Sequence, residues 1–160
     1  MGRKNDIGVM SDEQTKPVLF HLRRYFVIQS SFKANREFES NRLEEIGLDV
    51  DATMYQSKKQ KNVWNITITI KTKDGTNPET CPYLFEVTLF GVFVCPQYLK
   101  MSKDERVNFK KLFYVNGCSV LYSTARELIR GMTASGPYRP CILPTFRFDP
   151  EDAEESLVAD

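Results

Sequence analysis

The segment from Val63 to Ile70 alternates between large apolar and mainly polar side chains, a pattern typical of a β-strand that is buried on one face. The large apolar residues occupy every second position: Trp64, Ile66, Ile68 and Ile70. Because successive side chains of a strand point to opposite faces, this segment predicts a sheet with one strongly apolar face. Such a face must be covered by a second layer, which the rest of the chain has to supply.

Three further segments have strand patterns. In Tyr25–Phe32 we expect one face to carry Phe26, Ile28 and Phe32. Ile46–Met54 is apolar at every second position, and Tyr83–Val94 is apolar on both faces apart from two residues, Glu86 and Thr88. A strand that is apolar on both faces belongs inside a sheet or in a subunit contact. The Asp74-Gly75 pair favours a turn between the last two strands, which would make them antiparallel.

Beyond the last strand the apolar spacing becomes that of a helix. Ser102 and Glu105 fit a capping box, so a short helix is predicted to begin there and to end before Gly117. A second helix is predicted from about Ser119 to Ala134, stopped by a glycine and a proline. Strands followed by helices predict an α+β domain.

Length and charge give the domain organisation. The 160 residues with a formal net charge of +1 suit one domain, and they give no global signal for a nucleic-acid or membrane-surface binder. The polar start of the chain predicts a disordered N-terminal arm over residues 1–16. Residues 17–148 would form the single domain. Residues 149–160 hold six acidic residues and no Lys or Arg, which predicts a solvated acidic tail.

The four cysteines form no C-x-x-C pair, and the chain has one histidine. This spacing fits neither a zinc site nor a disulfide scaffold, so we expect buried, reduced thiols and no metal or other cofactor. No apolar run reaches the roughly 18 residues of a membrane span, and the first residues lack the apolar core of a secretory signal. We therefore expect a cytoplasmic protein without stable membrane insertion.

The stretch from Gly117 to Phe148 resembles the long helix and closing loop of the SecB family of bacterial export chaperones. The resemblance lies in Gly117-Cys118-Ser119, Ala125-Arg126-Glu127, Gly136-Pro137 and Leu143-Pro144, with Phe146 and Phe148 after them. Shorter matches follow the family's order earlier in the chain: Ser31-Phe32, Leu48-Asp49-Val50-Asp51, Phe85-Glu86-Val87 and Gly91-Val92-Phe93. The resemblance implies a four-stranded antiparallel sheet with a long helix packed on one face, and a homotetramer built as a dimer of dimers.

The function that the resemblance implies is that of an ATP-independent holdase for protein export, which binds unfolded polypeptides in exposed apolar grooves. Such a protein needs continuous apolar surface rather than catalytic groups. The implied groove residues are Phe38, Leu43, Ile46, Leu48, Val50, Leu112 and Phe113. The implied helix interface between dimers consists of Leu121, Ala125, Leu128 and Met132. For each of these residues, ordinary core packing is the competing interpretation.

The sequence departs from the family at the contact with SecA, the translocase motor. The family's sheet presents carboxylates to SecA, and Glu86 matches one of them. Gln29 and Lys33 occupy the two other expected acidic positions, and a reversed charge weakens such a contact. An alternative within the family is therefore a chaperone dedicated to stabilising the antitoxin of a toxin–antitoxin system, which needs the same groove.

Two other classes of function have sequence features to be weighed. An enzyme would have to use Cys118, Tyr122, Arg126 or Glu127, but adjacent helical residues point about 100° apart and do not form a shared site. A nucleic-acid-binding adaptor is suggested by Lys58-Lys59-Gln60-Lys61 beside Trp64. Lysines in a loop next to a strand more commonly form a solvated turn. We therefore expect no catalytic residues and no nucleic-acid partner.

Overall fold

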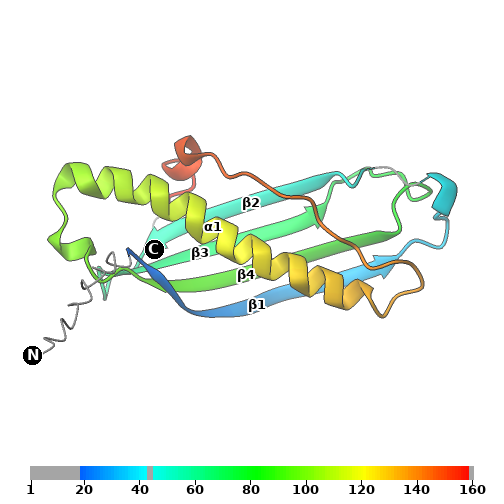
Figure 1. Cartoon of the computed structure of the whole chain (residues 1–160), viewed down its shortest axis with the longest axis horizontal. Helices are drawn as coiled ribbons and strands as arrows, with labels where there is room; N and C mark the ends of the chain where they lie inside the picture. Colours follow the sequence, from blue (N-terminus) through cyan, green and yellow to red (C-terminus); the bar gives the residue numbers. More distant parts are fainter. Residues whose placement is uncertain (1–18, 43–44, 159–160) are drawn as a thin grey trace, which may run out of the picture.

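The structure is a computed structural model that describes residues 19–42 and 45–158. In this part of the chain, four strands form one antiparallel sheet in the order β1-β4-β3-β2, and one long helix crosses a single face of it (Figure 1). The elements are β1 (His21–Ala34), η1 (Ser40–Arg42), β2 (Leu48–Gln56), β3 (Val63–Thr72), β4 (Tyr83–Val94), η2 (Tyr98–Lys100), α1 (Lys103–Thr133) and η3 (Pro150–Ala153). This architecture confirms the predicted α+β class. The arm predicted for residues 1–16 lies outside the described residues.

The core lies between α1 and the two central strands. The alternating apolar residues of β3 are at most 1% exposed and all face the helix. β4 lies inside the sheet as predicted, between β1 and β3. The two strands are antiparallel, and Gly75 takes a left-handed φ of 77° in the turn at Asp74-Gly75. The connection is longer than that turn alone, because it extends over residues 73–82.

The first strand departs from the predicted alternation. Register shifts between Leu22 and Arg24 and between Val27 and Gln29 each place an extra residue in β1. Such a bulge moves the side chains that follow it to the other face. Phe32 therefore lies opposite Phe85 on the helix side, whereas Phe26 lies opposite Phe90 on the outer side. The predicted shared face of Phe26 and Phe32 is wrong for this reason.

A single helix replaces the two predicted ones. The predicted capping box is present, since the Ser102 side chain accepts from the Glu105 N–H and the Glu105 carboxylate accepts from the Ser102 N–H. Gly117 does not end the helix but lies inside it. A Cβ at Gly117 would stand 2.5 Å from Ile66 Cδ1, and one at Gly91 would stand 2.9 Å from a Leu121 methyl. Both glycines therefore bring the helix close to the sheet.

After the helix the chain turns back over the sheet. Residues 138–148, called the strap below, run beside α1 towards β2, and η3 follows them (Figure 1). Residues 149–158, the C-terminal segment, contact the domain at some positions: Ala153 is fully buried, and Leu157 makes a parallel bridge to Met54. Ion pairs join Lys111 to Glu151 and Lys110 to Glu154. The described part of this segment is therefore packed on the domain through its small and apolar residues, and its acidic side chains face solvent.

Candidate functional site

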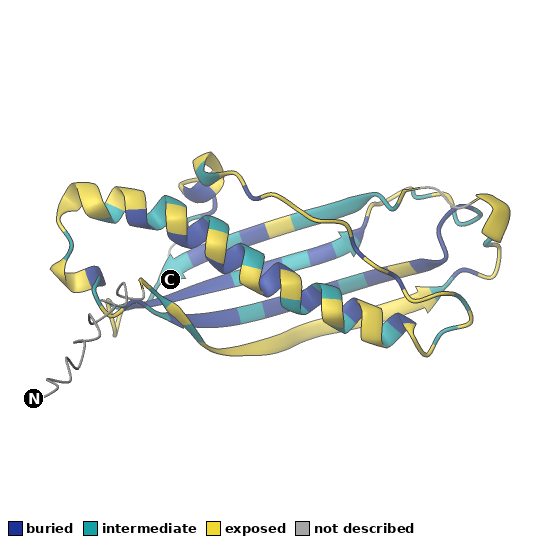
Figure 2. Ribbon diagram, viewed as in Figure 1, coloured by how far each residue is buried: buried dark blue, intermediate teal, exposed yellow. Residues whose placement is uncertain are grey.

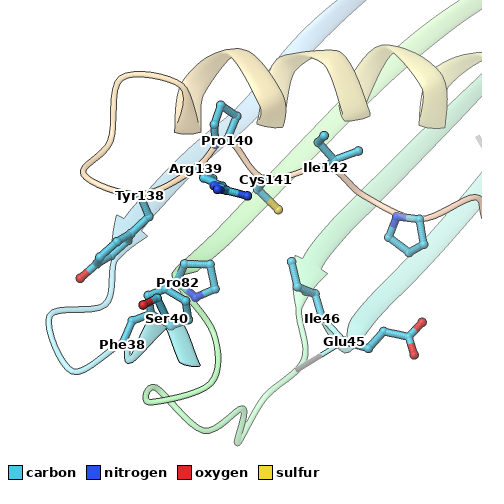
Figure 3. A pocket seen from close by; sticks show the side chains of 11 residues that line it. Phe38, Ser40, Glu45, Ile46, Pro82, Tyr138, Arg139, Pro140, Cys141 and Ile142 are labelled. Atoms are coloured by element: carbon cyan, nitrogen blue, oxygen red, sulfur yellow. The ribbon is translucent and has the colours of Figure 1, made fainter. Parts of the chain in front are cut away.

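An apolar groove of about 640 Å³ opens at the end of the sheet where β2 begins. Figure 3 shows the side chains around it, which come from the β1–β2 connection, from the residue before β4 and from the strap. Its lining consists of Phe38, Ser40, Glu45, Ile46, Pro82, Tyr138, Arg139, Pro140, Cys141, Ile142 and Pro144. Most of these side chains are apolar, so the groove offers a surface for apolar groups.

Tyr138 holds the strap against the β1–β2 connection. Its ring meets the ring of Phe38 edge to face, with the ring centres 5.0 Å apart. Its hydroxyl donates to the carbonyl of Asn35, the residue after β1, at 2.7 Å. Asn35 is in turn bound to the residues before β4, through its N–H to the Pro82 carbonyl and its side chain to the Cys81 carbonyl. One side of the groove is thereby a connected set of aromatic rings and hydrogen bonds.

The hydroxyl of Tyr83, at the start of β4, fixes the point where the helix passes into the strap. Tyr83 is 1% exposed, and its oxygen accepts from the Tyr138 N–H at 2.9 Å. The carbonyls of Thr133 and Tyr138 lie within 3.2 Å and 3.0 Å as acceptors for its proton. The Thr133 hydroxyl accepts from the Cys141 N–H at 2.8 Å. The strap is therefore held by buried hydrogen bonds and not by apolar contact alone.

Around Ile142, buried and exposed side chains alternate along the strap. Cys141 and Leu143 are 4% and 1% exposed, whereas Ile142 between them is 70% exposed, the highest value among the exposed large apolar residues of the described chain. The carbonyl of Pro144 accepts from the Tyr122 hydroxyl of α1 at 2.8 Å. A strap anchored on both sides of Ile142 keeps a large apolar side chain at the mouth of the groove.

The described lining of the groove includes one thiol and one charged group of each sign. Burial raises the pKa of the Cys141 thiol to about 11, so this cysteine stays protonated and unreactive near neutral pH. Arg139 and Glu45 are exposed and place one charge of each sign at the lining. Within residues 19–42 and 45–158, no three His, Cys, Asp or Glu residues gather so that they could hold a metal ion. What the groove can do chemically is to bury apolar side chains.

The structure brings some of the predicted groove residues together and separates others. Phe38 and Ile46 line the groove, and Leu48 and Val50 continue from it along β2 as half-buried side chains. Leu43 lies outside the described residues.

Two predicted groove residues lie elsewhere. Leu112, 44% exposed, lines a separate hollow between α1 and the end of the strap. Phe113 is fully buried between Trp64, Phe93 and Phe109, so its assignment to the groove is wrong. Because helical residues one position apart point in different directions, these two neighbours could not both have faced one groove.

The strap residues of the groove were not predicted from the sequence. Tyr138 and Ile142 belong to no periodic pattern, because the strap is neither a helix nor a strand of the sheet. A usable signal exists in the prolines at 137, 140 and 144, which favour an extended chain, together with the apolar residues between them.

The structure corrects the predicted helix interface for two of its four residues. Leu121 and Ala125 are fully buried against the sheet of their own chain, so they have no surface to offer a partner, and that assignment is wrong for them. Leu128 and Met132 are half-buried at the margin of the core and keep some exposed surface. Apolar residues spaced by four, three and four positions indicate the side of a helix that is packed against another element. In this structure, that element is the sheet of the same chain.

The first strand is the most exposed apolar element of the sheet. β1 is exposed along nearly its whole length, while β3 and β4 are mostly buried (Figure 2). Its large apolar side chains include Ile28, which is 63% exposed, and Tyr25, Phe26, Val27 and Phe32, which are 38–45% exposed. A long edge strand with exposed apolar residues readily pairs with another chain.

The predicted SecA-contact positions share the outer face of the sheet. Glu86 stands opposite Ser31 in β1 and Lys71 in β3, and Gln29 and Lys33 lie on the same face of β1. A hydrogen bond from Lys71 to Asp74 raises the pKa of this lysine, and the nearby charge of Glu86 adds to the effect. This face therefore carries charges of both signs instead of an acidic patch.

The residues considered for other functions do not assemble into sites. Burial raises the pKa of the Cys118 thiol to about 12, and Glu127 pairs with Arg130 rather than with a nucleophile. Trp64 is 1% exposed and packs against aromatic core residues, so it cannot stack on a nucleotide base. No helix among the described residues is sufficiently long and apolar to traverse a lipid bilayer.

Comparison with known proteins gives one family and two structural likenesses. A family model described as preprotein translocase subunit SecB matches residues 12–150. The fold is similar to that of the SecB-like chaperone Rv1957 of Mycobacterium tuberculosis, solved in complex with a ChAD peptide from the HigA1 antitoxin Rv1956. The TM-score is 0.58 at 11% identity, over 81% of this chain and 91% of that one. A protein of unknown function from Streptococcus agalactiae gives a TM-score of 0.39 at 17% identity, over 79% and 97% of the two chains. No curated protein matches the sequence.

Proposed function

Because the chain belongs to the SecB family, we propose that it is an ATP-independent holdase that binds unfolded polypeptides in the groove between the β1–β2 connection and the strap. The observation that carries this proposal is the exposed apolar lining of the groove, above all Ile142 at 70% exposure. Exposed apolar side chains that are held in place at a concave surface are typical of sites for apolar ligands. The role requires neither a cofactor nor a catalytic group.

The open edge of β1 supports an oligomer as the working form. We propose that two copies join their sheets through β1, and that two such dimers pack through their helices into a homotetramer. Val107, Leu112 and Val120 are 41–49% exposed on α1, and with Leu128 and Met132 they supply the helix contact in place of the buried Leu121 and Ala125. Several grooves in one assembly would bind separate segments of one client, which strengthens binding by raising the effective concentration.

Export is the first candidate for the cellular role, through transfer of clients to SecA in the cytoplasm. The single acidic residue at the three expected positions, Glu86, stands beside Lys71 and on the same face as Lys33. Mixed charge of this kind weakens attraction to a basic partner surface.

A second candidate is protection of an antitoxin. Two observations favour it: the mixed charge around Glu86 and the fold likeness to a chaperone that was solved with an antitoxin peptide. An antitoxin client would use the same groove, because it too offers an exposed apolar segment. The two roles differ in the partners that they require, because only the export role requires SecA to bind the outer face of the sheet.

Light scattering after size exclusion tests the holdase and the tetramer together. We expect a mass near four times 18.5 kDa, and stable capture of a slowly folding, unfolded protein without ATP. Replacing Ile46 by Ser should weaken capture, while Leu99→Ser, which lies outside the groove, should not. A protein that leaves unfolded clients free to aggregate would refute the holdase, and a monomer would refute the assembly.

A further inference from the structure

One end of the molecule carries lysines around an exposed aliphatic side chain. We propose that this end, called the basic tip below, docks on the surface of an anionic lipid bilayer. The basic tip consists of Lys59 and Lys61 in the β2–β3 loop, and of Leu99, Lys100 and Lys103 in η2 and at the start of α1. The inference goes beyond the proposed holdase function and does not depend on it, because neither the groove nor a client takes part.

The fold brings the two parts of the basic tip together. β2 ends and β3 begins at the end of the sheet where β4 also ends. The N–H of Cys95, just after β4, donates to the Asn62 carbonyl of the β2–β3 loop at 2.7 Å. The rings of Trp64 and Tyr98 meet edge to face behind this bond, with their centres 5.4 Å apart. Two stretches that are distant in the sequence thus form one surface, and η2 and the start of α1 lie beyond the strand ends (Figure 1).

The charge of this surface is positive, although the whole chain is close to neutral. Residues 57–62 and 95–106 hold six basic and two acidic residues, and one of the two acids, Glu105, is occupied in the capping box. The four lysines of the basic tip are exposed and form no ion pair with any described residue. By contrast, Lys110 and Lys111 further along α1 are paired with the C-terminal segment. The fold therefore leaves the positive charge of the basic tip uncompensated.

Leu99 adds an apolar contact at the centre of these charges. Its side chain is 58% exposed, and its carbonyl accepts from the Arg106 guanidinium at 3.3 Å. The neighbouring Tyr98 is buried, with the same guanidinium 5.1 Å from its ring centre, so the backbone that carries Leu99 is anchored. An aliphatic side chain that enters the boundary between headgroups and acyl chains, with basic residues around it, is typical of binding to anionic membranes. Lysine suits this position, since its stem packs on apolar surface while its ammonium group reaches a phosphate.

The same features favour lipid over nucleic acid as the polyanion. Proteins that bind single-stranded nucleic acid stack the bases on exposed aromatic rings. Trp64 and Tyr98, the aromatic residues that join the two loops, are 1% and 6% exposed, and the exposed side chain is the aliphatic Leu99. A fluid bilayer also requires no fixed spacing of charges, so mobile lysines on two loops suffice, each strengthening binding by about fivefold.

Co-sedimentation of the full chain with vesicles tests the inference. We expect binding to vesicles of phosphatidylcholine mixed with phosphatidylglycerol at least about tenfold tighter than binding to phosphatidylcholine alone. Raising the salt concentration to about 0.5 M should remove most of this binding, because salt screens exposed charges. Absence of binding, or equal binding to the two kinds of vesicle, would overturn the inference.

A charge reversal locates the contact. Lys59→Glu/Lys61→Glu should weaken binding to the anionic vesicles at least about tenfold. Arg36→Glu/Lys73→Glu is the matched control, because it changes the net charge equally at exposed residues beyond the opposite end of the sheet, and it should weaken binding less than about twofold. Equal losses in the two variants, both shown to be folded by circular dichroism, would assign the effect to net charge and overturn the inference.

Leu99→Ser separates a lipid surface from other polyanions. It should weaken binding to the anionic vesicles by about threefold or more, since it removes an inserted apolar side chain. Ile142→Ser, which removes an exposed aliphatic side chain in the groove, should leave vesicle binding unchanged. Unchanged binding in Leu99→Ser, or single-stranded polyuridylate that binds the protein as tightly as the vesicles do, would overturn the assignment to lipid.

The outcomes for this inference and for the holdase are distinguishable. Lys59→Glu/Lys61→Glu should still capture an unfolded client in the absence of vesicles, because both residues lie outside the groove. A protein that captures clients and ignores anionic vesicles would keep the holdase and overturn the basic tip as a docking surface. A protein that binds anionic vesicles through the basic tip and ignores clients would support this inference and refute the holdase.

Discussion

Removing the Tyr83 hydroxyl should destabilise the protein by about 2–4 kcal/mol. The hydroxyl accepts one hydrogen bond from the Tyr138 N–H and donates to one of two carbonyls, at Thr133 or Tyr138. Tyr83→Phe deletes both bonds, and the loss of the donated bond has a net cost of about 1 kcal/mol. It also leaves the Tyr138 N–H without its partner at a half-buried position, which adds a desolvation cost of about 1–3 kcal/mol.

Urea denaturation followed by circular dichroism measures this loss. The unfolding midpoint should fall while the slope stays unchanged, because the variant exposes the same surface on unfolding. In thermal scans the midpoint should fall by about 5–15 °C for a chain of this size. A looser strap should also be cut faster by trypsin after Arg147, an exposed strap residue that no proline follows.

Two other tyrosines serve as matched controls for the same chemical change. Tyr122→Phe removes one bond, to the Pro144 carbonyl at 2.8 Å, and should cost about 1 kcal/mol. Tyr25→Phe, at a side chain 45% exposed, should change the free energy of unfolding by less than about 0.5 kcal/mol. A loss below about 0.5 kcal/mol for Tyr83→Phe would refute the reasoning that this hydroxyl anchors the strap.

Three further predictions concern the groove, the helix start and the thiols. Ile142→Ser should weaken client binding about fivefold to thirtyfold, because burial of this side chain, which is 70% exposed, contributes about 1–2 kcal/mol to binding. Leu99→Ser, at a side chain 58% exposed outside the groove, should change the client affinity less than about twofold. Fluorescence anisotropy with a labelled client would measure both affinities. Ser102→Ala should lower the melting temperature by about 2–4 °C because it breaks the capping box. The hydrogen bond from the Ser102 backbone lowers the pKa of the Glu105 carboxyl. The stability that this bond contributes is therefore present above the usual pKa of a carboxyl and is lost as the pH falls through the lowered pKa. Thermal scans from about pH 2 to 5 should show this loss of stability, and the loss should be smaller in Ser102→Ala. The four buried cysteines, including Cys141 with a pKa of about 11, should react with a thiol dye at least about a hundredfold more slowly in the native protein than in denaturant, and rapid labelling of the native protein would contradict their burial.

Much of the fold could be predicted from local patterns because the strands that form the core repeat their signal over many residues. The bounds of β4 match the prediction at both ends, and β3 differs only by extending to Thr72. The faces of β1 could not be predicted, since a bulge depends on the register with β4 and leaves no mark in the alternation. Gly117 was misread for a similar reason: its role is set by the distance to Ile66, which only the folded chain defines.

The site was less predictable because its parts come from separate stretches of the chain. Phe38 and Ile46 were identified through the family resemblance, and both line the groove. Phe113 and Leu121 were assigned to surfaces, yet apolar residues on a helix look the same whether they face a client, a partner or their own sheet. The strap was missed because an extended, non-periodic segment gives no pattern to read, although it provides the most exposed apolar side chain of the groove.

The folded position of the acidic C-terminal segment also affects how fast partners arrive. Glu151 and Glu154 lie against Lys111 and Lys110, so opposite charges are interleaved on one surface instead of being separated between a basic body and an acidic tail. With a net charge of +1, the molecule has little long-range field to attract a charged chain through solution. Encounters with clients should therefore proceed at unsteered diffusional rates that change little with salt, and discrimination between clients should lie in how slowly they leave.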